Sequence, residues 1–260
     1  MAILFDLDGV FYQGDKPLTG AAEVAAWVIQ RKIPHLFITN TSSRPRSALL
    51  EKLEDFGIHT DLSHIFTPAA ATVGWLKQQP GKQCLALFVP ESTQIEFKSF
   101  SLWQEDDDDV TTVVVGDLGE SWTFSRLNQA FRLLMKQPKP RLIALGMTRY
   151  WQAADGLRLD VAPFIVALEH AADVHAIVMG KPAILFYQTA LSILGWTADK
   201  TIMIGDDIRG DIEGAQNAGI AGILVKTGKF RPADLTLNIK PEGGVLDSIS
   251  DLPSWWQQHC

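Results

Sequence analysis

The sequence contains few cysteines, and only Cys84 and Cys260 occur among its 260 residues. Two cysteines so far apart do not form the disulfide framework that is typical of small secreted domains. The first residues also lack the basic start and the apolar stretch of a signal peptide, because Asp6 follows almost at once. We therefore expect a protein of the reducing cytoplasm.

Long hydrophobic runs and an excess of positive charge are missing as well. No stretch approaches the roughly 18 consecutive apolar residues of a membrane span. The chain has 23 Lys and Arg against 30 Asp and Glu, which gives a formal net charge of −7. A field that attracts nucleic acid or an anionic membrane surface needs the opposite balance. The sequence thus predicts no nucleic-acid partner and no membrane partner.

The composition that remains is that of an ordinary globular protein, with 47% apolar and 20% charged residues. At roughly 100 to 200 residues per domain, the length predicts one or two domains. The run Asp106 to Asp109 places four carboxylates before an expected strand, and we interpret it as a solvated turn rather than a metal site.

Three short apolar runs in the chain end abruptly in polar residues. They are Ala2 to Phe5 before Asp6-Leu7-Asp8-Gly9, His35 to Ile38 before Thr39-Asn40, and Thr201 to Ile204 before Gly205-Asp206-Asp207. Such runs are typical of buried strands in a parallel sheet, and ligands of open α/β sheets bind beyond the carboxyl ends of the strands. The pattern therefore predicts a site with carboxylates, a hydroxyl and an amide at one edge of one sheet.

Strand and helix patterns alternate in the first 80 residues, as they do in α/β proteins. Helices are expected at 20–32 with Thr19 as N-cap, at 47–56, and at 69–78 after Thr67-Pro68. Gln79-Pro80-Gly81 interrupts this pattern and marks a boundary.

A second alternation of strands and helices follows the boundary, and the first pattern resumes at Ile177. The later elements are expected as strands at 84–89, 110–115, 141–145 and 221–225, helices at 121–136, 163–172 and 208–217, and an irregular surface at 235–244. The order predicts a Rossmann-like, doubly wound parallel-sheet core with an inserted α/β domain. The expected division is 1–79 and 179–260 for the core and 80–178 for the insertion.

Two carboxylates, Asp6 and Asp8, lie two residues apart just after the first expected strand. Alone they repel a phosphate dianion, so the arrangement makes sense with a cation such as Mg²⁺, which prefers hard oxygen ligands. Asp206 and Asp207 are candidates to complete its shell. With the charge offset, Asp6 is a candidate nucleophile that forms an aspartyl phosphate, and Asp8 a candidate general acid and base.

Phosphoryl transfer depends on positioning and charge stabilisation, and Thr39, Asn40 and Lys181 supply the residue types for it. Each motif also has an ordinary structural interpretation. Thr39 and Asn40 can cap a strand, Lys181 can be a surface lysine, and Asp207 can cap the next helix. The ordered combination favours the functional interpretation.

The ordered motifs resemble those of the haloacid dehalogenase superfamily. They are Phe5 to Val10, Ile38 to Asn40, Gly180-Lys181-Pro182, and Ile204 through Asp211. The insertion of about 100 residues resembles that of the subgroup with a large α/β cap, class IIA, which includes p-nitrophenyl phosphatases. Further segments resemble the branch of the phospholysine phosphohistidine inorganic pyrophosphate phosphatases, among them Gly116 to Ser121, Arg149 to Trp151, Gly156 to Asp160 and Thr227 to Pro232.

The resemblance implies a Mg²⁺-dependent phosphatase for a small phosphate ester, phosphoramidate or pyrophosphate, with Asp6 as nucleophile and Asp8 as general acid and base. It further implies Mg²⁺ ligands from Asp6, the Asp8 carbonyl and Asp206, with Asp207 and Asp211 orienting the metal's waters or Lys181. By the same resemblance, the phosphate is bound by Thr39, Asn40 and Lys181. The cap selects the substrate, and the candidates for this role are Glu120, Thr148, Arg149 and Tyr150. We also expect two copies of the chain to pair through the cap. The alternative function is phosphate binding without turnover.

Overall fold

The computed structural model describes residues 1–105, 109–153 and 155–260, so Asp106 to Asp108 of the acidic run lie outside the described residues. It divides into two compact units. Unit 1 comprises Met1–Thr39, Arg46–Phe66 and Lys181–Cys260, and unit 2 comprises Asn40–Pro45 and Thr67–Gly180. In the part of the chain that is described, no helix combines the length and the apolar character needed to cross a membrane.

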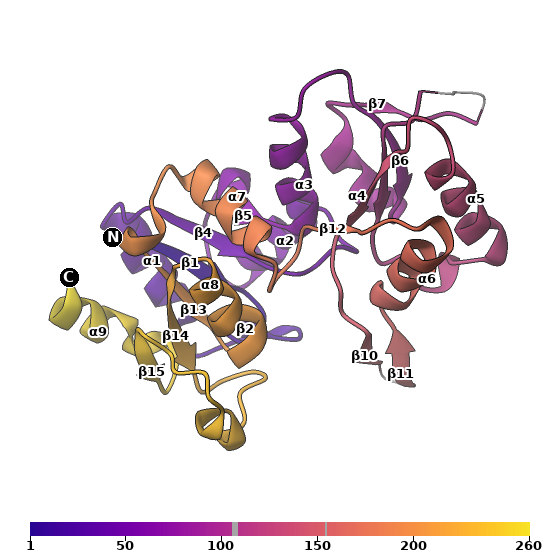
Figure 1. Ribbon diagram of the computed structural model, residues 1–260. Helices are drawn as coiled ribbons and strands as arrows, with labels where there is room; N and C mark the ends of the chain where they lie inside the picture. Colours follow the sequence, from indigo (N-terminus) through magenta and orange to yellow (C-terminus); the bar gives the residue numbers. More distant parts are fainter. Residues whose placement is uncertain (106–108, 154) are drawn as a thin grey trace. The chain divides into compact units, whose positions relative to one another are not determined.

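Unit 1 is built on a six-stranded parallel sheet (Figure 1). Its order is β15 (Gly244–Leu246), β14 (Ala221–Val225), β13 (Thr201–Gly205), β1 (Ala2–Asp6), β4 (His35–Ile38) and β5 (Ile65–Phe66). Phe5 of β1 lies opposite Ile204 of β13 and Phe37 of β4. The three apolar runs of the sequence are therefore neighbouring strands, and the polar residues that follow them start from one edge of the sheet.

Helices cover both faces of this sheet. They are α1 (Ala21–Gln30), α2 (Arg46–Asp55), α7 (Ile184–Leu194), α8 (Gly214–Asn217) and α9 (Leu252–His259), with a π-helix at Ile208–Glu213. One face carries Ile3, Phe5 and Phe37 into a core with residues of α1, α2 and α9. On the other face Phe66 of β5 packs against Phe186 of α7, with ring centroids 4.9 Å apart. The fold is a doubly wound α/β sheet, and this prediction is confirmed.

Unit 2 has a parallel sheet of its own. Its order is β12 (Ile177–Val178), β9 (Arg141–Ala144), β8 (Thr112–Val115), β6 (Cys84–Phe88) and β7 (Ser101–Leu102). Its helices are α3 (Pro68–Leu76), α4 (Glu91–Gln94), α5 (Phe124–Leu134) and α6 (Ala162–Ala172). A β-hairpin, β10 (Tyr150–Ala153) with β11 (Gly156–Leu159), lies between β9 and α6 in the chain, and a second hairpin in unit 1 joins β2 (Tyr12–Gln13) to β3 (Lys16–Pro17).

Helix α3 and the short segment 40–45 belong to unit 2. The Arg141 guanidinium lies 5.8 Å from the ring of Trp75 in α3, and the Thr93 hydroxyl donates to the Ser42 carbonyl over 3.1 Å. The boundaries at 79/80 and 178/179, which rest on sequence pattern, stay a prediction about domains.

Helix ends differ from the sequence predictions in informative ways. Thr19 does not cap α1, because Gly20 occupies the N-cap position with φ of 80° and no side-chain bond. Thr67 does cap α3, since its hydroxyl accepts from the Ala70 N–H over 3.2 Å. The expected helix at 208–217 begins as a π-helix. The region 235–244 is not wholly irregular, because it overlaps a 3-10 helix at Pro232–Thr236 and reaches the first residue of β15. The other 3-10 helices are Leu62–His64, Ile95–Phe97, Gly119–Ser121, Ala198–Lys200 and Ile249–Asp251.

Candidate active site

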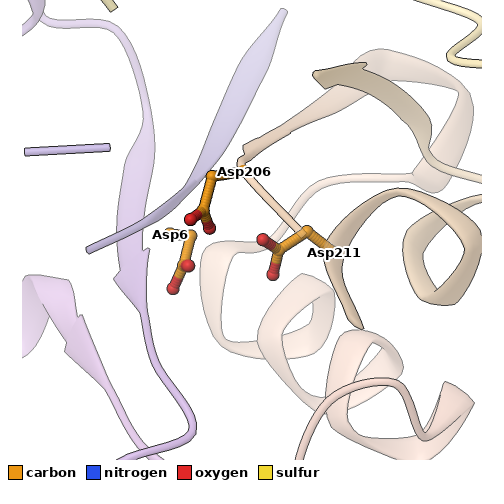
Figure 2. A group of neighbouring side chains, drawn as sticks. All are labelled: Asp6, Asp206 and Asp211. Atoms are coloured by element: carbon orange, nitrogen blue, oxygen red, sulfur yellow. The ribbon is translucent and has the colours of Figure 1, made fainter. Parts of the chain in front are cut away.

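Three buried aspartates meet at the carboxyl edge of the sheet in unit 1 (Figure 2). Asp6 is the last residue of β1, Asp206 follows β13 directly, and Asp211 belongs to the π-helix after it. Each offers a carboxylate oxygen, and these oxygens lie within 4.8 Å of one another. So many carboxylates in one buried place repel each other unless positive charge is present.

Lys181 supplies part of that positive charge. Its Nζ donates to Asp6 Oδ1 and to Asp211 Oδ1, each over 2.6 Å, and its side chain is almost fully buried. Burial alone lowers the pKa of a lysine, but the carboxylates of Asp211 and Asp6 outweigh it and raise the pKa of Lys181. A charged ammonium therefore holds Asp6 and Asp211 in fixed positions.

Asp206 has one oxygen bonded and one left over. Its Oδ2 accepts from the Lys229 N–H over 2.6 Å, while its buried Oδ1 has no partner among the described residues. Burial and the neighbouring carboxylates of Asp6 and Asp211 raise the pKa of Asp206 to about 8. An unpartnered, buried carboxylate oxygen beside a second carboxylate is the donor set that a hard divalent cation such as Mg²⁺ prefers. The residues present thus fit a Mg²⁺ ion.

Two glycines let the backbone close around Asp206. Gly9 has φ of 91° and Gly228 has φ of 58°, conformations that other residues rarely adopt. A Cβ atom built on either glycine would overlap Asp206 Oδ2. Thr227 adds to the closure, since its hydroxyl donates to the Gly9 carbonyl. The loops after β1 and β14 therefore both pack closely against Asp206, and each loop needs a glycine at the point of contact.

Asp207 caps the helical segment that follows it. Its Oδ1 accepts from the backbone N–H groups of Arg209 and Gly210 over 3.0 and 2.9 Å. Burial would raise the pKa of Asp207, but these N–H groups and the nearby Lys229 hold it below its usual range. The structural interpretation of Asp207 is thus correct, and the Asp207 N–H in turn donates to Asp211 Oδ2 over 3.1 Å.

Asp211 has both carboxylate oxygens engaged, one by Lys181 and one by Asp207. Burial and Asp6 raise its pKa to about 6 against the lowering effect of Lys181. Tyr187 of α7 fixes the backbone here, because its hydroxyl donates to the carbonyls of Gly210 and Asp211 over 2.7 and 3.1 Å. These bonds favour a supporting position for Asp211 over direct metal ligation.

The remaining candidates of unit 1 are Asp8 and Thr39. Asp8 is exposed to solvent, yet the protein around its carboxyl group and the charge of Asp6 raise its pKa. Thr39 follows β4 and is buried, with its backbone N–H donating to the Phe66 carbonyl over 3.1 Å. β4 lies beside β1, so Thr39 and Asp6 leave the same edge of the sheet.

The candidates of unit 2 do not form one cluster. Glu120 pairs with Arg158 over 3.2 Å at the surface, and Arg149 lies over the Tyr150 ring at 5.9 Å. Thr148, in contrast, lines a cavity of about 240 Å³. The other residues of this cavity that bear on its chemistry are Asn40, Ser42, Asp117, Trp151 and Asp160. Burial and the charge of Asp117 raise the pKa of Asp160.

Lys229 is a site residue for which the sequence interpretation had no role. Besides its backbone bond to Asp206, its Nζ lies 3.4 Å from Asp207 Oδ2. Burial alone would lower the pKa of Lys229, but the carboxylates of Asp207 and Asp6 raise it by more, so the net shift of its pKa is upward. A usable signal existed, since Gly228-Lys229 follows the strand run 221–225 just as the other site residues follow theirs. Asp117 and Asp160 lie in the segments 116–121 and 156–160, for which the resemblance implied no site role, and only the fold brings the two residues to one cavity.

Two family models cover most of the chain. The model for haloacid dehalogenase-like hydrolases matches residues 3–101, and a second, HAD-hydrolase-like model matches residues 178–252. The human phospholysine phosphohistidine inorganic pyrophosphate phosphatase is 35% identical over 99% of this chain and 94% of the relative. The chain belongs to the haloacid dehalogenase-like hydrolases. The bovine haloacid dehalogenase-like hydrolase domain-containing protein 2 is 38% identical over 90% of this chain and 86% of its own length.

Solved structures agree with this family. A 4-nitrophenylphosphatase from Thermotoga maritima superimposes with a TM-score of 0.86, with 25% identity over 97% of this chain and 96% of that one. A hypothetical protein from Pyrococcus horikoshii gives a TM-score of 0.89 with 26% identity, covering 98% and 99% of the two chains. The comparisons identify the chain as a phosphatase of the class IIA branch, in which an α/β cap is inserted into the core.

Proposed function

We propose that this haloacid dehalogenase-like phosphatase hydrolyses a small phosphorylated substrate with Mg²⁺, through an aspartyl phosphate on Asp6. The observation that carries the proposal is the unpartnered, buried Asp206 Oδ1 beside Asp6. Asp6, Asp206 and the backbone carbonyl of Asp8 would hold the ion. When bound, Mg²⁺ offsets the negative charge of the carboxylates and of the phosphoryl oxygens.

The first chemical step is attack by an Asp6 carboxylate oxygen on phosphorus. The new O–P bond forms as the bond from phosphorus to the leaving oxygen or nitrogen breaks, and Asp8 donates its proton to that leaving atom. The raised pKa of Asp8 supports a proton donor at this position. Thr39, Asn40 and Lys181 bind the phosphoryl oxygens and stabilise their charge.

The second step releases phosphate. Asp8, now a carboxylate, takes a proton from water as the water oxygen bonds to phosphorus and the bond to Asp6 breaks. Lys181 and Lys229 remain charged throughout, because the surrounding carboxylates raise their pKa values. Asp207 and Asp211 act as positioning residues, since their bonds hold Lys181 and the turn after β13.

For the substrate we propose a phosphate ester, phosphoramidate or pyrophosphate, with a preference for leaving groups that bear an amine. The support comes from the cavity of unit 2, in which Asp117 and Asp160 face a small space with Trp151. Two acids repel a second phosphate but attract a protonated amine. Asn40, one of the proposed phosphate-binding residues, also lines this cavity.

Hydrolysis of p-nitrophenyl phosphate with and without Mg²⁺ tests the reaction. We expect metal-dependent phosphate release, and its absence in well-folded protein would favour the alternative of phosphate binding without turnover. A panel of phosphorylated amines, sugar phosphates and pyrophosphate then tests the substrate class. Asp160→Asn should lower the preference for amines about tenfold, while Glu120→Gln, a change in a surface ion pair, serves as the control.

Two further expectations remain part of the proposal. A cytoplasmic location agrees with the low cysteine content, and fractionation of cells that produce the protein tests it. Pairing of two copies through the cap is tested by light scattering of the purified protein, which should give twice the mass of 28.7 kDa.

A further inference from the structure

The hairpin of β2 and β3 in unit 1 follows shortly after Asp8, the proposed general acid. Only Tyr12–Gln13 and Lys16–Pro17 pair in it, and Gly14 and Asp15 form the turn between them. So short a two-stranded hairpin is marginally stable by itself in water. The position of its turn therefore depends on contacts with the rest of the unit.

Asp8 is connected to this hairpin through both its backbone and its side chain. A β-bridge joins Asp8 to Tyr12, and the Gly9 N–H donates to the Tyr12 carbonyl over 2.6 Å. In the turn, the Gly14 N–H donates a hydrogen bond to the Asp8 carboxyl group. Because Asp8 is exposed to solvent, the direction of its carboxyl group depends on where the turn lies.

Lys52 of α2 contacts both the turn and the first strand of the hairpin. Its Nζ donates to the Gly14 carbonyl over 2.8 Å and lies 3.4 Å from Asp15 Oδ1. The same ammonium group lies over the Tyr12 ring, 4.3 Å from its centroid, where a cation is attracted to the ring face. The Lys52 side chain is only 19% exposed, so it makes these contacts largely out of water.

The two bonds from Lys52 to the turn differ in strength. The Asp15 side chain is 98% exposed, and an ion pair at such a position contributes little. The Gly14 carbonyl accepts a short bond from a charged donor, and such bonds are stronger than those between neutral groups. Gly14 therefore connects the two side chains, since its carbonyl accepts from Lys52 and its N–H donates to Asp8.

We propose that Lys52 is a positioning residue for Asp8, a role that rests on the proposed function of Asp8 as general acid. Lys52 holds Gly14 in place, and Gly14 keeps the Asp8 carboxyl group where it can protonate the leaving atom. Without the ammonium group the turn moves more freely, and the proton of Asp8 reaches the leaving oxygen or nitrogen less often. The loss of rate should therefore depend on how much the leaving atom needs that proton.

Two substrates of nearly the same shape test this dependence. The p-nitrophenolate anion leaves phosphorus readily, whereas the leaving oxygen of phenyl phosphate depends more on protonation. Lys52→Met keeps an apolar side chain of similar length and removes the ammonium group. It should lower kcat/KM about tenfold for phenyl phosphate and less than about threefold for p-nitrophenyl phosphate. Equal losses for the two substrates would overturn the proposal, because a merely structural role affects both alike.

Three further variants serve as comparisons. Lys52→Arg keeps a charged donor and should restore most of the kcat/KM for phenyl phosphate. Asp15→Asn removes only the exposed ion pair and should change this kcat/KM by less than about twofold. Lys200→Met removes an exposed lysine elsewhere in unit 1 and should leave both substrates unaffected.

Hydrogen–deuterium exchange of the full chain without substrate tests the contact independently of turnover. Lys52→Met should speed exchange of the backbone amides in residues 9–14 about tenfold, because the hairpin opens more often, and Lys200→Met should not. Unchanged exchange in Lys52→Met would overturn the proposal whatever the kinetics show. Faster exchange in Lys52→Met, in a chain whose parent releases no phosphate from either substrate, would support the contact with Gly14 and overturn the proposed function instead.

Discussion

The two sheets of this protein share an architecture but not a chemistry. Both are parallel, and helices pack against each. In unit 1, β1 ends in Asp6, β4 leads into Thr39, and β13 leads into Asp206. In unit 2, β8 leads into Gly116-Asp117 and β9 into Leu145-Gly146, so a single carboxylate, that of Asp117, follows these two strands closely. The comparison teaches that a parallel sheet provides a binding edge at the carboxyl ends of its strands, while the residues that follow the strands decide whether this edge can bind and transfer a phosphoryl group.

The largest contrast should come from replacing one strand-end carboxylate in each unit. Asp6→Asn removes the proposed nucleophile and should lower kcat by at least about 10³-fold. Asp117→Asn, after β8 in unit 2, should change kcat by less than about tenfold and act mainly on KM. Steady-state kinetics with p-nitrophenyl phosphate measure both, and equal losses of kcat would break the comparison.

Removal of the metal should have the next largest effect and should act through unit 1. Chelation by EDTA should abolish turnover, and added Mg²⁺ should restore it and raise the melting temperature, because a ligand that binds the folded state stabilises it. Asp206→Asn should lose this thermal response, whereas Asp117→Asn should retain it. Differential scanning fluorimetry across Mg²⁺ concentrations provides the measurement.

The metal-free protein should also respond to pH in a defined direction. The pKa of Asp206 is raised from 3.8 to about 8 on folding, so below pH 3.8 its contribution is fully present. As the pH rises toward 8 the unfolded chain loses its proton first, and stability falls. Saturating Mg²⁺ should flatten this fall. A metal-free protein that gains stability between pH 4 and 8 relative to Asp206→Asn would contradict the assignment.

Glycine substitutions should have a smaller effect and again separate the units. Gly228→Ala places a Cβ against Asp206 at φ of 58° and should cost about 1–3 kcal/mol of folding free energy, together with Mg²⁺ affinity. Gly116→Ala brings a Cβ to 3.1 Å from Leu145 Cδ1 without a positive φ, and should cost less than about 1 kcal/mol. Urea unfolding of both variants decides the order.

The smallest effect concerns the amino edge of the core sheet, where His35 is buried and neutral. Its folded pKa lies below the usual 6.5, so acidification protonates the unfolded chain first. The contribution of His35 to stability is therefore complete above about pH 6.5 and is lost as the pH falls toward its folded pKa. Urea midpoints between pH 7 and 5 should fall less for His35→Phe than for the parent chain.

The sequence predicted the parts of the site that depend on strand ends. Asp6, Thr39 and Asp206 follow runs whose apolar character alone identifies neighbouring buried strands, so their common edge was predictable. The fold class was predictable for the same reason, because alternation of strands and helices has few solutions.

Features that depend on close packing were not predictable. The π-helix at Ile208–Glu213 has no pattern distinct from that of an α-helix, and its shape follows from the bonds of Asp207 and Asp211 to the backbone. The role of Lys229 depends on how the loop after β14 closes on Asp206, which only the glycine conformations make possible. The cavity beside Asp117 and Asp160 joins segments that are distant in the chain, so the sequence pattern within either segment does not show that they share it.

The short segment Asn40–Pro45 has a consequence for anyone who wishes to exchange caps between relatives. It is separate in the chain from the rest of unit 2, yet Ser42 accepts from the Thr93 hydroxyl through its carbonyl and from the Asp117 N–H through its own hydroxyl. A transplant of residues 67–180 alone would leave behind a piece of the module it aims to move. A working chimera has to carry both stretches, so unit 2 is not modular at the level of a single gene fragment.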